Sequence, residues 1–189
     1  MQIGFDAKRL FLNHSGLGNY SRNLVRAMHN YFPTNQYHLF TTKVSSAYPD
    51  FLNDAFQIIT PKGIVNNFLK SSWRSNSITK QINIQNLDVY HGLSNELPFT
   101  ISNFKGKKIV TIHDLIFIRY PNYYNSFDCA TYRKKVTSAC QKADVVIAIS
   151  KQTKNDLIEF LKISESKIKV IYQSCDETFW NYKSNSDNT

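Results

Sequence analysis

The stretch Lys108-Ile-Val-Thr-Ile-His-Asp-Leu115 places an apolar, β-branched run directly before a histidine and an aspartate. Residues 145–149 form a second run that is apolar at consecutive positions. β-Branched residues favour strands, and strands that are apolar on both faces are typical of a parallel sheet covered by helices. The two runs therefore predict buried strands of such a sheet.

Five further runs of similar character bring the number of predicted strands to seven: residues 2–7, 37–41, 56–60, 87–91, 108–112, 144–149 and 168–172. Apolar residues at helical spacing predict a helix from Asn19 that ends before Pro33 and a second helix over residues 124–142. A third should begin at Ser150, whose hydroxyl can cap it. This alternation indicates an α/β fold with a doubly wound, mostly parallel, Rossmann-like sheet and helices on both faces.

The composition of the 189-residue chain is that of an ordinary globular protein, with 42% apolar and 20% charged residues. No apolar run reaches the length of a membrane span, and the N-terminus lacks the regions of a signal peptide, so we expect a cytoplasmic protein. Cys129, Cys140 and Cys175 have no metal-ligand spacing and cannot all pair, which fits a reducing compartment and argues against a zinc site.

The net charge of +9 favours anionic partners. The basic residues are scattered, however, and no dense basic run alternates with aromatic residues, which argues against a nucleic-acid partner. Residues 62–85 are predicted to be helical and carry Lys70, Arg74 and Lys80 among apolar residues. A solvated helix with its apolar side on the sheet is the first interpretation, and a helix that lies on the inner face of the membrane is the alternative.

In an open parallel sheet, ligands bind beyond the carboxyl ends of the strands. Gly16 and Gly18 precede a predicted helix there, and they allow either a phosphate-binding loop or a loop that only caps the helix. A dinucleotide site, and with it an oxidoreductase, is disfavoured because about eight residues separate the first strand from Gly16. In addition, the second strand ends in Thr41-Thr-Lys43 without an acid.

The histidines at two strand ends are further candidates. A lone histidine there is often a structural hydrogen-bonding group, but His113 has Asp114 beside it and His91 at the end of another strand. Neighbouring strand residues point to opposite faces, so Asp114 can fix the following loop rather than orient His113. The absence of Gly-x-Ser-x-Gly, Walker and His-Glu-x-x-His sequences argues against the commonest hydrolases, nucleotidases and metalloproteases.

Six motifs follow one another along the chain: Phe5-Asp-Ala-Lys-Arg9 with Gly16-Leu-Gly-Asn-Tyr20; Tyr90-His-Gly-Leu-Ser94; Thr111-Ile-His-Asp-Leu115; Arg119-Tyr-Pro121; Ala143-Asp144 with Ala148-Ile-Ser150; and Ile168-Lys-Val-Ile-Tyr172. In order and spacing, the chain resembles the N-terminal domain of glycosyltransferase family 4, whose members are retaining enzymes with the GT-B fold. The resemblance extends from about residue 2 to residue 180.

The resemblance implies a Rossmann-like, acceptor-side domain over residues 1–180 and a polar linker or tail over residues 181–189, with the C-terminal nucleotide-sugar-binding domain absent. It implies a nucleotide-diphosphate sugar as donor, a saccharide or lipid-linked acceptor, and neither a cofactor nor an essential metal. His113 is the expected catalytic residue, near the transferred sugar. The expected donor and acceptor cleft comprises Gly16, Gly18, Asn19, His91, Gly92, Ser94, Asn95, Asp114 and Ser150.

These assignments are chemically consistent. Sugar hydroxyls are recognised by directional hydrogen bonds, which His113 and Asn95 can supply, whereas the leaving diphosphate needs positive charge and amide donors. In the family, the second domain holds the diphosphate and the nucleotide, so we expect this chain alone to be inactive. The alternative function is a non-enzymatic module that binds glycans or anionic lipid.

Overall fold

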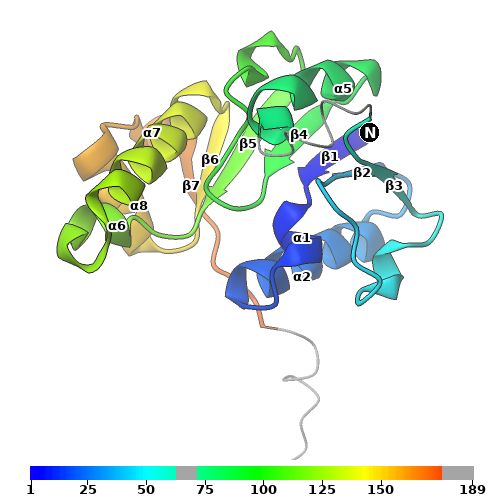
Figure 1. Cartoon of the computed structure of the whole chain (residues 1–189), viewed down its shortest axis with the longest axis horizontal. Helices are drawn as coiled ribbons and strands as arrows, with labels where there is room; N and C mark the ends of the chain where they lie inside the picture. The colour runs from blue at the N-terminus through cyan, green and yellow to red at the C-terminus, as the bar shows by residue number, and fades with distance from the viewer. Residues whose placement is uncertain (63–71, 176–189) are drawn as a thin grey trace, which may run out of the picture.

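The computed structural model describes residues 1–62 and 72–175. Seven parallel strands form one sheet in the order β3-β2-β1-β4-β5-β6-β7 (Figure 1). The strands are β1 (Gln2–Asp6), β2 (Gln36–Phe40), β3 (Phe56–Ile59), β4 (Val89–Gly92), β5 (Lys107–Ile112), β6 (Val145–Ala148) and β7 (Ile168–Val170). The predicted fold class and the seven predicted strands are confirmed, with small differences at the strand ends.

The helices of the described ranges are α1 (Lys8–Leu12), α2 (Gly16–Tyr31), α5 (Ile78–Ile84), α6 (Ile116–Arg119), α7 (Ser126–Lys142) and α8 (Lys151–Leu161). Short helical turns are η1 (Pro49–Phe51), the π-helical η2 (Trp73–Ser77), η3 (Ile101–Asn103), η4 (Pro121–Tyr123) and η5 (Glu165–Lys167). The three helices predicted above are present, although α2 begins at Gly16 rather than Asn19. Ser150 caps α8 as predicted, because its Oγ accepts a hydrogen bond from the Thr153 amide at 3.0 Å.

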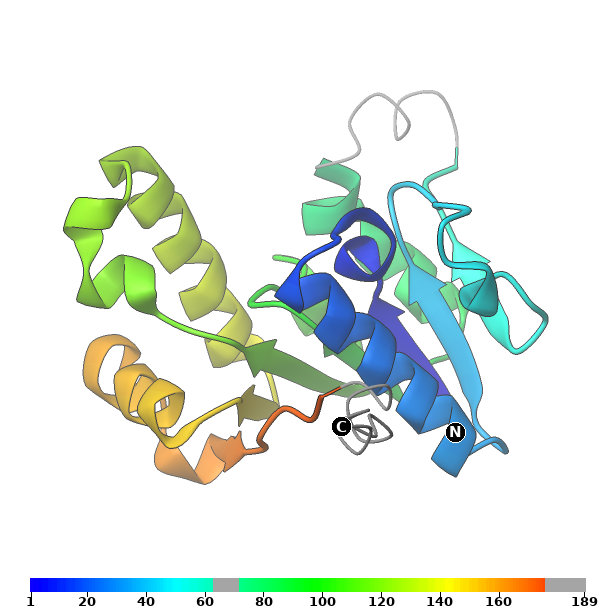
Figure 2. The same cartoon turned by 90° about the horizontal axis from the view of Figure 1, so that it is seen from below.

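The core is divided between the two faces of the sheet, because neighbouring strand residues point in opposite directions. Leu39 packs in the cluster that includes α1 and α2, whereas Phe40 packs in the cluster that includes α5, α7 and α8. In both views α1 and α2 lie apart from α7 and α8 (Figures 1 and 2). On β5, Val110 and Ile112 belong to the second cluster, so Thr111 and the following His113 face α2.

The first interpretation of residues 62–85 is supported where the structure describes them. The side chains of Trp73, Ile78 and Ile82 in η2 and α5 are at most 1% exposed and join the core. The part that contains Lys70 lies outside the described residues. None of the helices within residues 1–62 and 72–175 is long and apolar enough to cross a membrane.

Arg74 departs from its predicted place on a basic helix surface. Its side chain is 11% exposed, and its guanidinium forms ion pairs with Asp6 and Glu96. Two carboxylates at the end of β1 and in the loop after β4 attract the cation inward. The alternative interpretation, in which these cations contribute to a membrane-binding surface, is therefore not supported at Arg74, whereas Lys80 is exposed.

Candidate functional site

The strand order reverses between β1 and β4, where the chain connections leave in opposite directions. The carboxyl ends of parallel strands at such a switch point form the usual ligand-binding crevice of this architecture. Three segments meet there: the start of α2, the loop 93–97 after β4, and His113 at the end of β5. The site is therefore built from parts of the chain that are far apart in sequence.

His113 is only 6% exposed, and both of its ring nitrogens have partners. Nε2 lies 2.9 Å from the carbonyl oxygen of Leu93, and Nδ1 lies 2.8 Å from the carboxamide nitrogen of Gln173. A carbonyl oxygen can only accept, so Nε2 carries the proton and Nδ1 accepts from the carboxamide. Burial lowers the pKa of His113, while the Leu93 hydrogen bond and Asp114 oppose this shift. The ring is thus a neutral imidazole in one tautomer.

The backbone of His113 is held as firmly as its ring. Its amide donates to Oδ1 of Asn95 at 2.8 Å, and its carbonyl accepts from the Thr153 hydroxyl at 3.0 Å. Asn95 has a left-handed backbone with φ of 61°, a conformation in which asparagine is enriched among residues other than glycine. The predicted cleft residue Asn95 is thus next to His113, and its side-chain oxygen positions the His113 backbone.

Tyr20 and His91 form the inner wall behind His113. The ring of Tyr20 meets the His113 ring edge-on, with 4.8 Å between the centroids. The Tyr20 hydroxyl and Nε2 of His91 lie 3.0 and 2.9 Å from the same oxygen, Oγ1 of Thr111. Burial, with a smaller effect from His113, lowers the pKa of His91 to about 3. His91 is therefore a neutral packing and hydrogen-bonding residue at physiological pH.

The glycine-rich loop has the helix-capping role that was one of the two interpretations given above. A Cβ atom on Gly18 would lie 1.8 Å from the Asn13 carbonyl oxygen, and the Gly18 amide donates to Oδ1 of Asn13 at 2.9 Å. Only glycine at position 18 allows Asn13 to approach the start of α2 closely enough to cap it. Gly16 is exposed, and a Cβ there would meet nothing within 4 Å, so ligand contact stays a prediction for Gly16. Asn19 is exposed, and its Oδ1 accepts from Arg22 at 2.5 Å.

The remaining predicted residues shape the loops around the site. Gly92 must be glycine, because a Cβ would lie 2.1 Å from the Glu96 carbonyl oxygen. Ser94 is 8% exposed. Oδ1 of Asp114 accepts from the Ile116 amide at 3.2 Å, which agrees with the interpretation that Asp114 fixes the following loop. Ser150 caps α8 and contacts Thr153, the residue that binds the His113 carbonyl.

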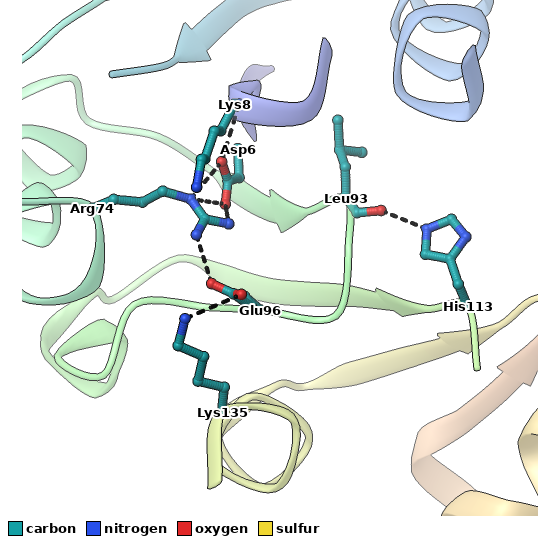
Figure 3. A network of polar contacts seen from close by, with 7 residues as sticks. All are labelled: Asp6, Lys8, Arg74, Leu93, Glu96, His113 and Lys135. Atoms are coloured by element: carbon teal, nitrogen blue, oxygen red, sulfur yellow. Dashed lines mark hydrogen bonds and ion pairs between the residues drawn. The ribbon is translucent and has the colours of Figure 1, made fainter. Parts of the chain in front are cut away.

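An ion-pair network on the other side of the loop 93–97 was missed by the sequence argument (Figure 3). Nε and Nη2 of Arg74 lie 2.9 and 2.6 Å from Oδ2 of Asp6, and Nη1 lies 2.5 Å from Oε2 of Glu96. Lys135 Nζ lies 3.4 Å from the other oxygen of Glu96. Burial lowers the pKa of Arg74, but the charges of Asp6 and Glu96 outweigh it and raise that pKa.

This network, here called the Arg74 network (Asp6, Arg74, Glu96 and Lys135), lines a cavity of about 10 Å³, which is room for about one water molecule. Figure 3 shows Arg74 between Asp6 and Glu96, while His113 faces the carbonyl group of Leu93 at the other end of the loop. The loop is therefore fixed at both ends, by charge at Glu96 and by the imidazole at Leu93.

Residues 14–179 match the family described as Glycosyltransferase Family 4. The chain belongs to glycosyltransferase family 4. The predicted family is thereby confirmed, and the sheet corresponds to the N-terminal half of GT-B glycosyltransferases. A sequence comparison with curated proteins finds no significant match.

Solved structures support the same fold. Anabaena Alr3699/HepE in complex with UDP has a TM-score of 0.60 and 14% identity, over 97% of this chain and 46% of that one. The complex of the same protein with UDP and glucose has a TM-score of 0.61 and 13% identity, over 97% of this chain and 47% of that one. A glycosyltransferase from Rickettsia africae ESF-5 has a TM-score of 0.57 and 15% identity, over 95% of this chain and 45% of that one. The chain thus spans about half the length of these structures, and at such identities the likeness concerns the fold.

In this family 4 domain, three residues were not among the sequence candidates for the site: Tyr20 and Gln173, which contact the His113 ring, and Arg74, which lies on the other side of the loop 93–97. Tyr20 directly follows the glycine-rich loop, but it lies within the helix predicted from Asn19 and so received no role at the site. Gln173 comes just after β7, so the rule of inspecting residues after each strand would have found it. Arg74 has no local signal, because its partner Asp6 is 68 positions away in the sequence.

Proposed function

We propose that this chain is the acceptor-side half of a retaining glycosyltransferase that moves a hexose or related sugar from a nucleotide-diphosphate sugar to a saccharide or lipid-linked acceptor. The observation that carries the proposal is the neutral, immobilised His113 at the switch point of a family 4 domain. The similar Anabaena protein has structures with UDP and with UDP and glucose, which supports a nucleotide-sugar donor.

The role assigned to His113 follows from its chemistry. A neutral imidazole can form directional hydrogen bonds with sugar hydroxyls, and a preorganised contact of this kind stabilises charge that develops as the glycosidic bond breaks. Gly16, which is open to solvent at the start of α2, is the candidate for backbone contact with the donor phosphate or the acceptor. The proposal includes a cytoplasmic location and a part in polysaccharide biosynthesis.

The proposal also assigns the nucleotide and most of the diphosphate binding to a C-terminal domain of the same enzyme. The chain spans about half of the solved structures that it resembles, which supports the need for such a partner. We expect purified residues 1–189 to transfer no sugar from a panel of nucleotide sugars to saccharide or lipid-linked acceptors, and a longer polypeptide with the second domain to do so. Sugar transfer by residues 1–189 alone would contradict this assignment.

A further inference from the structure

The two partners of the His113 ring differ in how firmly they are held. Leu93, which accepts from Nε2, is 0% exposed and belongs to the loop that Glu96 anchors to the Arg74 network. Gln173, which donates to Nδ1, is exposed and belongs to the segment after β7. Nδ1 is therefore the nitrogen whose partner can be exchanged without moving the sheet or its buried loops.

Gln173 makes the kind of hydrogen bond to Nδ1 of His113 that a hydroxyl group of a substrate could make. The carboxamide N–H donates to Nδ1 from the solvent side, as a sugar O–H would. A fully ionised diphosphate oxygen has no proton to donate, so it cannot take this position on the neutral ring. While Gln173 is in place, neither ring nitrogen of His113 is open to a ligand.

We propose that the Gln173 carboxamide occupies, on Nδ1 of His113, the position of a substrate hydroxyl, and that a sugar hydroxyl displaces it when substrate binds. This inference rests on the proposed function and specifies it further. His113 accepts a hydrogen bond from a neutral hydroxyl of a sugar through Nδ1, and does not contact the leaving diphosphate through that nitrogen. Gln173 then occupies the place of the substrate hydroxyl until substrate arrives, while the Leu93 carbonyl holds the ring in its Nε2–H tautomer.

The surroundings of the ring keep Nδ1 unprotonated. Burial is the largest influence on His113 and lowers its pKa, and the charge of Arg9 acts in the same direction. Asp114 opposes them. From α2, the ring of Tyr20 is uncharged, because burial raises its pKa, and from β4 His91 is neutral. Nδ1 of His113 therefore carries no proton at neutral pH and can accept a hydrogen bond.

The first test uses the 189-residue chain and nitrogen NMR of its histidine rings. The chain has five histidines, so a His113→Asn variant assigns the signals. We expect His113 of the wild type to be an Nε2–H tautomer. Gln173→Ala should shift the Nδ1 signal because it removes the donor, and Gln173→Glu should raise the pKa of His113 because it adds a negative charge. Ser174→Ala is the matched control, since the Ser174 hydroxyl contacts only the Cys175 carbonyl among the described residues.

Unchanged His113 signals in Gln173→Ala, together with an unchanged pKa in Gln173→Glu, would overturn the inference and leave the proposed function standing. The second test uses the longer enzyme. Gln173→Ala should lower KM by about two- to tenfold with kcat retained, because the substrate hydroxyl no longer competes with an internal hydrogen bond. A fall of kcat as large as that of His113→Ala would contradict displacement. If the longer enzyme transferred no sugar, the proposed function would be contradicted. The NMR experiment would still show whether Gln173 donates to Nδ1 of His113.

Discussion

Replacing Arg74 by methionine should destabilise the domain by about 3–5 kcal/mol, because a carboxylate pair would be left without its shared cation. The side chains of Arg74, Asp6 and Glu96 are 11%, 6% and 21% exposed, so water can replace the cation only poorly. Methionine keeps the helical preference of arginine and most of its apolar stem, so the main change is the loss of charge and hydrogen bonds. Lys135 still contacts Glu96, so we expect the lower part of the range.

Urea unfolding followed by circular dichroism measures the effect. With a slope of about 2 kcal/mol per molar urea, the lower part of that range corresponds to a fall of the midpoint by about 1.5–2 M. Arg26→Met is the matched control, since Arg26 pairs with Asp50 at 3.1 Å but the two side chains are 40% and 66% exposed. That pair should contribute less than about 1 kcal/mol. Equal midpoint shifts for the two variants would refute the argument that burial makes the Arg74 network strong.

The pH dependence separates charge from packing in the same experiment. Burial alone would raise the pKa of Glu96, but Arg74 and Lys135 lower it below the ordinary value of 4.5. The stabilisation from Glu96 is therefore present above pH 4.5 and is lost as the pH falls through its lower, folded-state pKa. The difference in the free energy of unfolding between wild type and Arg74→Met should therefore become smaller as the pH falls below 4.5. A difference that stays constant down to acid pH would indicate lost packing instead.

In the longer enzyme, His113→Ala should lower kcat by about one to three orders of magnitude with folding intact by circular dichroism, and full activity would show that His113 is incidental. Gly18→Ala should destabilise the chain by about 1 kcal/mol or more in urea unfolding, because the new Cβ meets the Asn13 carbonyl, whereas Gly16→Ala should change stability by less than about 0.5 kcal/mol. His91 should remain neutral in NMR titrations down to about pH 3, because burial lowers its pKa, and titration near 6.5 would contradict its burial. Its contribution to stability should fall as the pH drops below 6.5, where the unfolded chain binds the proton first.

The sequence was sufficient for the sheet because each strand is encoded locally. The run 109–112 is β-branched at every position and carries no charge, and a buried strand follows from that pattern alone. The position of His113 at the carboxyl edge followed in the same way, since it comes directly after this strand. The start of α2 was predicted too late, at Asn19 instead of Gly16, because the side chain that accepts from the Gly18 amide belongs to Asn13, which does not adjoin the helix.

The partners of the site residues could not be predicted, because they depend on how distant segments dock. Nothing around Arg74 distinguishes it from the other cations of residues 62–85 until the sheet places Asp6 and Glu96 beside it. The Gln173 contact likewise joins positions 60 residues apart. The role proposed for His113 remains a prediction that the activity of His113→Ala tests, and ligand contact at Gly16 remains a prediction.

The place of β1 within the sheet has a consequence for synthesis on the ribosome. Its first neighbour, β2, pairs through Gln2 with Gln36, but its other neighbour, β4, pairs through Ile3 with Val89. One edge of β1 therefore stays unpaired until the nascent chain is more than twice as long, and such open edges can pair with other chains. The hydrogen bonds of the His113 ring are complete only once Gln173 has emerged, so the environment of this side chain forms after the last strand of the described sheet, β7, has been synthesised.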